Sequence, residues 1–316
     1  MNKTKQIARA VVLTFLFGIP LWLLGSVFGL MFGQKRPSEQ KPTIKYAIFD
    51  LGNVLIKRNK VAEMRKIGLL RIIQYLATLH NPMRISRKMQ ETANLVCPIE
   101  DEHLKARTPD GTMPLPQIFR DWLSGKYSSE KTLERAIQFI DENPEQFRDK
   151  AERKFVEKAL KLAFVPENLS KTLSPVKEGI KFVQECKDLG LEVLILSNLD
   201  AETYELMKIR YPALFELFEE ENIFISAKLG VIKPDPQIYD VLLQNRGLDP
   251  QACVFFDDQK ENIEAAQDCE INAILCPQKK KLFGSEPNIE HLRQELAQLI
   301  MENSQPAKNE EQTARA

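Results

Sequence analysis

The 316-residue chain carries no excess charge of either sign, because 44 lysines and arginines balance 44 aspartates and glutamates. Nothing global therefore points to nucleic acid as a partner. The five cysteines are odd in number and include no CxxC pair and no Cys/His zinc spacing. Neither a disulfide framework nor a zinc cage is predicted, and buried thiols would suit a reducing compartment.

One long stretch, residues 10–33, contains no charged side chain. At about 1.5 Å per residue it is long enough to cross a hydrocarbon layer of about 30 Å. We therefore expect a basic N-terminus at 1–9 followed by an uncleaved, single-pass transmembrane helix at 10–33. A cleaved secretory signal stays open as an alternative, although no Ala-x-Ala cleavage site follows.

Three glycines at four-residue spacing could let two such helices approach closely, which makes a homodimer through Gly25, Gly29 and Gly33 an expectation. Basic residues flank the apolar stretch on both sides, so charge does not fix its orientation. Residues 57–88 are basic, with Glu63 as their only acid. This segment could rest on an anionic cytoplasmic leaflet or steer phosphorylated substrates, or it could be a solvated helix face. A cytoplasmic catalytic domain on a membrane anchor is the predicted location.

The rest of the sequence predicts an α/β fold. A polar linker at 34–44 leads to an apolar strand at 46–49, after which residues 57–173 show helical spacing only. Short apolar strands then alternate with helices; these strands are expected at 191–196, 223–225, 253–256 and 273–276. Such alternation predicts a parallel, Rossmann-like sheet with helices on both faces.

The predicted catalytic core combines residues 45–56 with 174–282. A helical cap at 57–173 is inserted after the first strand, and a closing helix and disordered tail occupy 283–316. Ser174 and Pro175 suit the N-cap and first position of the helix that re-enters the core.

Reactive side chains cluster where predicted strands end. Asp50 closes the first apolar run, Ser197 follows the second, and Asp257 and Asp258 follow the run 253–256. Lys233 lies in a loop stiffened by Pro234. In a parallel sheet these ends meet at one edge, so a nucleophilic carboxylate, a hydroxyl, an ammonium and paired acids would share a crevice. Adjacent acids repel unless a cation intervenes, which favours Mg²⁺.

Each residue alone has an ordinary explanation. Asp50 could merely cap a turn, Ser197 with Asn198 is common turn chemistry, and a lysine before proline is usually solvated. Their occurrence together, in this order and at matching strand ends, favours a phosphoryl-transfer site.

The segments that carry these residues resemble the haloacid dehalogenase (HAD) superfamily; they are FDLGNVL at 49–55, LSN at 196–198, IKPDPQIY at 232–239, and FFDD at 255–258 with Asn262. Within it the chain is most similar to sugar phosphatases of the alpha-glucose-1-phosphate phosphatase type, which share a similar FDLGNV segment. The resemblance implies that Asp50 is the nucleophile and Lys233 the charge-neutralising lysine. It also implies phosphate contacts from Ser197, Asn198 and Asn53, and a Mg²⁺ site made by Asp50, the Gly52 carbonyl, Asp257 and Asp258, with Asn262 in support.

One departure from the superfamily pattern matters. Most of its phosphatases carry an acid/base aspartate two positions after the nucleophile, where this chain has Gly52. Loss of such a group typically costs about 10² to 10⁴ in rate, so a substitute or a good leaving group is required. Glu63 and His80 of the cap are two possible substitutes.

The leading expectation is a membrane-anchored, Mg²⁺-dependent phosphatase of a small phosphorylated metabolite. A catalytically weak or inactive scaffold at the membrane is the main alternative because of Gly52. Haloacid dehalogenation is less favoured, because that chemistry needs no metal and leaves the paired acids at 257 and 258 unexplained.

Overall fold

The sheet at the centre of the protein is parallel, as predicted. The computed structural model describes residues 42–304 apart from 69, 71, 74, 76–83, 101–102, 109–110, 112 and 282–283. Its five strands lie in the order β5-β4-β1-β6-β7 and all pair in parallel. They are β1 Tyr46–Phe49, β4 Glu192–Ser197, β5 Ile223–Ile225, β6 Cys253–Asp257 and β7 Asn272–Leu275. The predicted strands are thus present, with ends shifted by a residue or two.

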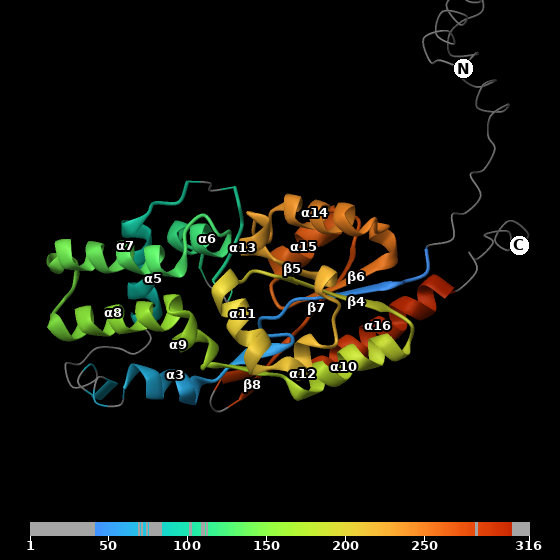
Figure 1. Ribbon diagram of the computed structural model, residues 1–316, viewed down its shortest axis with the longest axis horizontal. Coiled ribbons are helices and arrows are strands. Elements are labelled where there is room, and N and C mark those ends of the chain that lie inside the picture. Colours follow the sequence, from blue (N-terminus) through green and yellow to red (C-terminus); the bar gives the residue numbers. More distant parts are fainter. Residues whose placement is uncertain are drawn as a thin grey trace, which may run out of the picture. The chain divides into compact units, whose positions relative to one another are not determined.

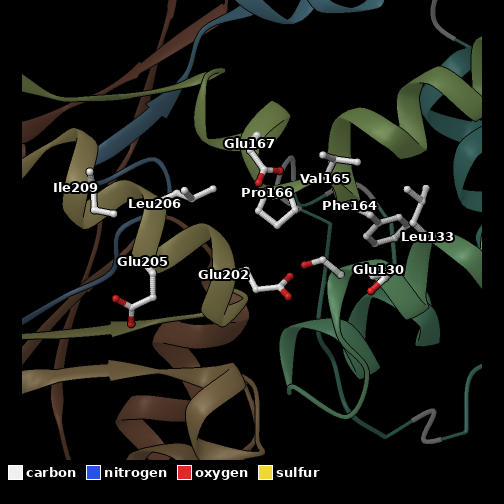
Figure 2. Close-up of a pocket in the computed structure, with 11 residues that line it drawn as sticks. Glu130, Leu133, Phe164, Val165, Pro166, Glu167, Glu202, Glu205, Leu206 and Ile209 are labelled. Carbon is white, nitrogen blue, oxygen red and sulfur yellow. The ribbon is translucent and has the colours of Figure 1, made fainter.

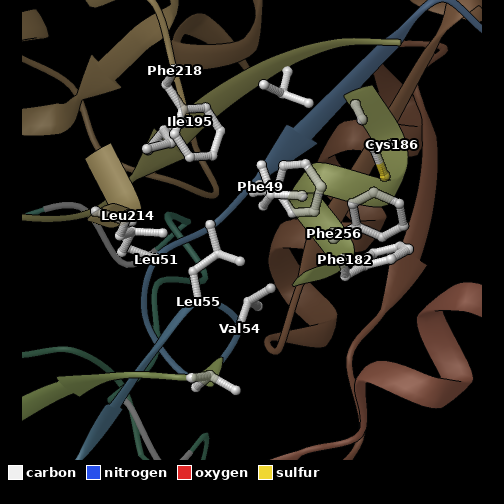
Figure 3. Close-up of a cluster of buried hydrophobic side chains, with 14 of the residues drawn as sticks. Phe49, Leu51, Val54, Leu55, Phe182, Cys186, Ile195, Leu214, Phe218 and Phe256 are labelled. Atoms are coloured by element: carbon white, nitrogen blue, oxygen red, sulfur yellow. The ribbon is translucent and has the colours of Figure 1, made fainter. Parts of the chain in front are cut away.

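Alternate residues of the central strand β1 enter two different cores. Ala47 and Phe49 face one cluster and Ile48 faces the other. Figure 3 shows the first cluster, where the Phe49 ring packs against those of Phe182 and Phe256 at centroid distances of 5.8 and 5.0 Å. Because both faces of the strand are buried, its sequence is continuously apolar and shows no alternation.

Helices cover both faces of this sheet (Figure 1). One face carries α10 Lys177–Asp188, α11 Ala201–Arg210, α12 Pro212–Phe215 and α16 Ile289–Ser304. The other carries α14 Pro236–Arg246 and α15 Lys260–Asp268. Shorter elements complete the core; they are α13 Ser226–Leu229, the 3-10 turns Glu220–Asn222 and Pro250–Ala252, and the hairpin β8 Gln278–Lys281 with β9 Gly284–Pro287.

The cap is helical and has a core of its own, built around Trp122 and Phe164. It comprises α3 Lys60–Ile67, α5 Arg84–Val96, α6 Gln117–Leu123, α7 Ser129–Glu142, α8 Lys150–Phe164, α9 Pro166–Ser170 and the 3-10 turn Pro144–Gln146. Cap and core touch closely at Gly125, where a β-carbon would lie 2.3 Å from the Ala227 carbonyl oxygen. Any larger residue at this position would push the cap away from the core.

A two-stranded antiparallel ribbon joins the two parts, and it corrects one prediction. β2 Ile56–Arg58 pairs with β3 Leu173–Pro175. Ser174 and Pro175, predicted to start a helix, are therefore strand residues, and α10 begins at Lys177 with Val176 as its N-cap. Proline is tolerated because it lies at the edge of a short ribbon, where no N–H is required of it.

The N-terminal predictions fall outside the described residues. Between residues 42 and 304, as far as the structure describes them, no helix is both long and apolar enough to cross a bilayer. The predicted span at 10–33, with Gly25, Gly29 and Gly33, is not among these residues and stays a prediction. All five cysteines are free, and all but Cys269 are buried.

Candidate active site

The carboxyl ends of β1, β4 and β6 bring the predicted residues together. Asp50 follows β1, and its main-chain N–H donates to the Phe256 carbonyl of β6 at 2.9 Å, which extends the ladder by one residue. Ser197 ends β4 and Asp257 ends β6. All three side chains are buried, and the Ser197 hydroxyl hydrogen-bonds the Asp50 carboxylate. The structure therefore brings these three predicted residues together at one edge of the sheet.

Lys233 is the cation of this cluster and is 1% exposed. Its Nζ lies 2.9 Å from Asp50 Oδ1, 2.6 Å from Asp257 Oδ2 and 2.9 Å from the Leu196 carbonyl oxygen. The three donors of the ammonium thus have three acceptors. The expectation that this loop presents a lysine to the carboxylate agrees with the geometry.

Asn198 holds the lysine loop in place. Its Nδ2 donates to the Lys233 carbonyl at 2.9 Å, and its Oδ1 accepts from the Lys233 N–H at 2.8 Å. Since both polar ends of the side chain are used, Asn198 positions Lys233. The phosphate contact that the resemblance implied for Asn198 stays a prediction.

The two adjacent acids have different surroundings. Asp257 is fully buried and accepts from Asn262 Nδ2 at 3.0 Å, from the Gln259 N–H at 2.8 Å and from Lys233. Asp258 is partly exposed and accepts from Asn53 Nδ2 at 2.8 Å. Asn262 thus supports Asp257, as the resemblance implied, whereas the Asn53 amide donates to the Asp258 carboxylate.

Burial and mutual repulsion raise the pKa of two of these carboxyls. For Asp50, burial outweighs the attraction of Lys233 and raises the pKa to about 6. For Asp258, burial and then the charges of Asp257 and Asp50 raise the pKa to about 8. Burial lowers the pKa of Lys233, but Asp257 and Asp50 together raise it above its usual value. One ammonium therefore serves a cluster of three acids and does not neutralise it.

This donor set fits a divalent cation. Oxygen atoms of Asp50, Asp257 and Asp258 all lie within 4.8 Å of one another. Carboxylate oxygens are the ligands that Mg²⁺ prefers, and a second positive group would offset the repulsion that, in addition to burial, raises both pKa values. The three carboxylates predicted to hold the metal thus lie close enough together to share one ion, and the contribution of the Gly52 carbonyl stays a prediction.

The cluster predicts a pH-dependent metal affinity. Below about pH 8 a divalent cation must displace the proton from Asp258 in order to bind. We therefore expect the affinity of the protein for Mg²⁺ to rise about tenfold per pH unit between pH 6 and 8 and to level off above pH 8. A carboxyl whose pKa is raised on folding still holds its proton in the folded protein at pH values where the same group is ionised in the unfolded chain. Without metal, the free energy of unfolding should therefore fall from pH 6 to pH 8. Calorimetry with EDTA, and Mg²⁺ titration at both pH values, measure the two effects.

Asp258→Asn provides the control for this prediction. It removes the group that titrates near pH 8, so both pH effects should shrink between pH 6 and 8. If the cation-free protein were equally stable at both values, the proposed coupling of these acids would be wrong.

Gly52 stands at the position where most phosphatases of the superfamily carry an acid/base aspartate. It is exposed and lies beside the nucleophile Asp50. A β-carbon at this position would lie 3.4 Å from Asp50 Oδ2, which is ordinary van der Waals contact. There is accordingly room for a side chain here. Of the two possible substitutes, Glu63 is bonded to Arg58 at 2.6 Å and lies in α3, and His80 is outside the described residues.

A cap loop reaches the rim of this site, which sequence analysis did not find. Arg107 Nε lies 3.1 Å from Glu261 Oε1, and Glu261 directly precedes Asn262. Ala106 and Leu115 of the same loop pack on Ile232, next to Lys233. No local signal could have revealed these contacts, because the cap residues and their partners in the core lie far apart in the chain.

A separate crevice between α11 and the cap helices α7, α8 and α9 has a volume of about 480 Å³ (Figure 2). Its floor includes Phe164 and Leu206, and none of the predicted site residues lines it. Its rim carries the four acids Glu130, Glu167, Glu202 and Glu205. Clustered negative charge would repel a phosphorylated ligand, so the crevice is not the phosphoryl site.

Fold and site together define an α/β enzyme with a buried carboxylate cluster at the carboxyl end of a parallel sheet and an inserted cap. The chain belongs to the haloacid dehalogenase-like hydrolases, because residues 44–269 match the sequence pattern of that family. It is therefore a hydrolase of that family.

Curated relatives match only part of the chain. A sesquiterpene phosphatase of Aspergillus oryzae is 31% identical over 96 residues, which are 30% of this chain and 47% of that protein. A phosphatase of Mycobacterium tuberculosis is 28% identical over 29% of this chain and 42% of its own length. A chloroplast flavin mononucleotide hydrolase of Arabidopsis thaliana is 29% identical over 28% and 41%, respectively. The chain thus spans less than half the length of these relatives.

Solved structures match more of the chain at lower identity. A predicted HAD-like hydrolase from Porphyromonas gingivalis is 17% identical over 81% of this chain and 98% of its own, with a TM-score of 0.49. A HAD family enzyme from Bacteroides thetaiotaomicron is 16% identical over 76% and 97%, with a TM-score of 0.48. At these scores the likenesses add nothing to the family assignment.

Proposed function

We propose that the protein is a Mg²⁺-dependent phosphatase that hydrolyses a small phosphorylated metabolite, specifically a sugar phosphate, through an aspartyl phosphate. One observation carries the proposal: Asp50 Oδ1 lies 2.9 Å from Lys233 Nζ inside a cluster of three acids. A carboxylate held by one cation at the end of a strand is suited to attack phosphorus. The phosphatases among its partial relatives support the same reaction class.

In this mechanism an Asp50 oxygen bonds to phosphorus as the ester oxygen leaves with its electron pair. Water then attacks the same phosphorus and releases Asp50 with inorganic phosphate. Lys233 offsets negative charge on Asp50 and the phosphoryl oxygens, and Ser197 offers a hydroxyl donor. Asp50, Asp257 and Asp258, with the Gly52 carbonyl, would hold Mg²⁺, which when bound supplies further positive charge at the transferring phosphoryl group.

The test is a screen of phosphate esters with residues 41–316, with and without Mg²⁺. Turnover that requires Mg²⁺ on one or more esters is expected. Turnover that survives metal removal would refute the proposal. If no ester is turned over although Mg²⁺ raises the melting temperature, the scaffold alternative raised by Gly52 is the better explanation.

Gly52 favours a substrate with a good leaving group, such as an anomeric sugar phosphate. Gly52→Asp should therefore raise kcat for a simple alkyl phosphate by roughly 10²-fold, the lower end of what a general acid contributes. It should change p-nitrophenyl phosphate turnover far less, because nitrophenolate leaves without a proton.

Gly52→Asn is the matched control for that variant, since it has the same size without an acid. An equal rise in the asparagine variant would show that the effect is not proton transfer. No rise in either variant would mean that leaving-group protonation does not limit the reaction.

We further propose that residues 10–33 anchor the enzyme in a membrane with its catalytic domain on the cytoplasmic side, and that Gly25, Gly29 and Gly33 pair two anchors. The uncharged stretch and the glycine spacing support this. Carbonate extraction of the full-length protein from membranes tests the anchor: release into the soluble fraction would contradict it.

A further inference from the structure

Helix α3 presents apolar side chains to solvent, which is the reverse of an ordinary surface helix. None of its residues is buried. The exposed fractions along α3 and the residues just after it are 44% for Val61, 47% for Met64, 68% for Leu70 and 52% for Ile73. These four account for a large share of the exposed large apolar side chains in the described part of the chain. A concentration of this kind marks an interaction surface.

The opposite side of this segment is already occupied. Tyr75 is buried and stacks on Phe155 of α8 at a centroid distance of 4.8 Å, and Lys66 Nζ donates to Asn168 Oδ1 at 3.2 Å. The segment is thus held against the cap by one side. The four exposed apolar residues, Val61, Met64, Leu70 and Ile73, thus belong to a segment that is fixed to the cap through other side chains.

The charge around the apolar row is positive. Arg58, Lys60 and Arg65 are exposed, and Glu63 is the only acid from Lys57 to Lys88. The Glu63 side chain is only 13% exposed and is paired with Arg58 at 2.6 Å and Lys60 at 3.5 Å. The hairpin β8–β9 contacts β2 and adds the exposed Lys279 and Lys280, while Glu286 of the same hairpin pairs with Lys57 at 2.6 Å.

We propose that this surface, Val61, Met64, Leu70 and Ile73 with the surrounding basic residues, docks on an anionic lipid bilayer. Apolar side chains would enter the interface while lysines and arginines contact acidic headgroups. A second copy of the chain fits less well, because two such faces would bring like charges together. The eight-residue stretch 34–41 spans at most about 28 Å, so an anchor at 10–33 would keep the described unit close to a membrane.

The test uses residues 42–304, which remove the predicted anchor from the experiment. These residues form one compact unit that contains all the described strand pairings and hydrophobic clusters. Circular dichroism confirms folding before use. The fragment should sediment with vesicles of phosphatidylcholine and phosphatidylserine, and at least tenfold less with phosphatidylcholine alone. High salt should weaken the binding.

Variants separate the two contributions. Replacing Val61, Met64, Leu70 and Ile73 together by serine should reduce binding at least tenfold, and Arg65→Gln should reduce it roughly fivefold at low salt. The matched control replaces Leu189 and Ile209, which are 63% and 80% exposed elsewhere, by serine and should bind like the parent. Any phosphatase activity in solution should be unchanged in all of them.

Several outcomes would overturn the proposal. Equal binding to both kinds of vesicle, or undiminished binding of the fourfold serine variant, would show that this surface does not recognise anionic lipid. Dimerisation of the fragment that the same substitutions abolish would assign the face to a second copy instead. Vesicle binding is measured without substrate, so a fragment that does not bind vesicles would not contradict the proposed phosphatase activity. A protein without phosphatase activity would likewise not contradict the proposed membrane docking.

Discussion

Asparagine in place of Asp50 is expected to abolish turnover, with a fall in kcat of at least about 10⁴-fold, because removal of a covalent nucleophile has effects of that order. The amide oxygen of asparagine cannot form and release an acyl phosphate under these conditions. Steady-state kinetics measure the loss. Mass spectrometry after acid quenching should find a phosphoryl group on Asp50 in the parent and none on the variant.

The same substitution should leave the fold intact. Asp50 is nearly isosteric with asparagine, and a neutral group there removes repulsion with Asp257 and Asp258. In the absence of Mg²⁺ the melting temperature of Asp50→Asn should therefore equal or exceed that of the parent. Asp240→Asn, on the exposed side of α14, is the matched control and should alter neither property. Turnover retained by Asp50→Asn would eliminate the nucleophile assignment.

The sequence was a good guide to the site because its signals are local. Each reactive residue directly follows a short apolar run, and parallel pairing then brings the ends of β1, β4 and β6 to one edge. Predicting that Asp50, Ser197 and Asp257 lie together therefore required no information on distant contacts beyond this rule of parallel sheets. The same reasoning led to the predicted cap, since an insertion after β1 must leave and re-enter the sheet beside Asp50.

Features that depend on partners far along the chain were missed. Ser174 and Pro175 have the sequence of a helix start, yet pairing with Ile56 and Lys57 makes them strand residues. The hydrogen bonds between Asn198 and Lys233, and the ion pair between Arg107 and Glu261, cannot be predicted from the sequence around either partner. In each case tertiary contacts decide between local alternatives that the sequence leaves equally open.

Replacement of Lys233 by methionine should damage both stability and activity. Methionine fills similar volume but leaves Asp50 and Asp257 buried without their cation. Breaking a buried ion pair in this way costs about 3 to 5 kcal/mol. In the absence of Mg²⁺ this predicts a fall in melting temperature of roughly 6 to 20 °C. Loss of charge stabilisation in the transition state should lower kcat about 10²-fold to 10³-fold.

The pH dependence and the response to metal show whether charge is the cause. The raised pKa of Lys233 means that its stabilising effect is fully present below its ordinary value near 10.5 and is lost only as pH rises through the higher folded-state pKa. In Lys233→Met the deficit should shrink on acidification, because Asp50 and Asp258 then take up protons. Mg²⁺ should raise the melting temperature of the variant more than that of the parent, since it would supply the missing positive charge.

Lys260→Met supplies the surface comparison for this variant. Lys260 pairs with Glu264 at 2.9 Å, but its side chain is 77% exposed and the pair is screened by solvent, so its loss should leave the melting temperature essentially unchanged. A deficit in Lys233→Met that is independent of both pH and Mg²⁺ would instead point to lost packing around Phe255, over whose ring the ammonium lies at 5.2 Å. In that event the three acids would be balanced by something other than Lys233, and the electrostatic basis of the proposed site would fail.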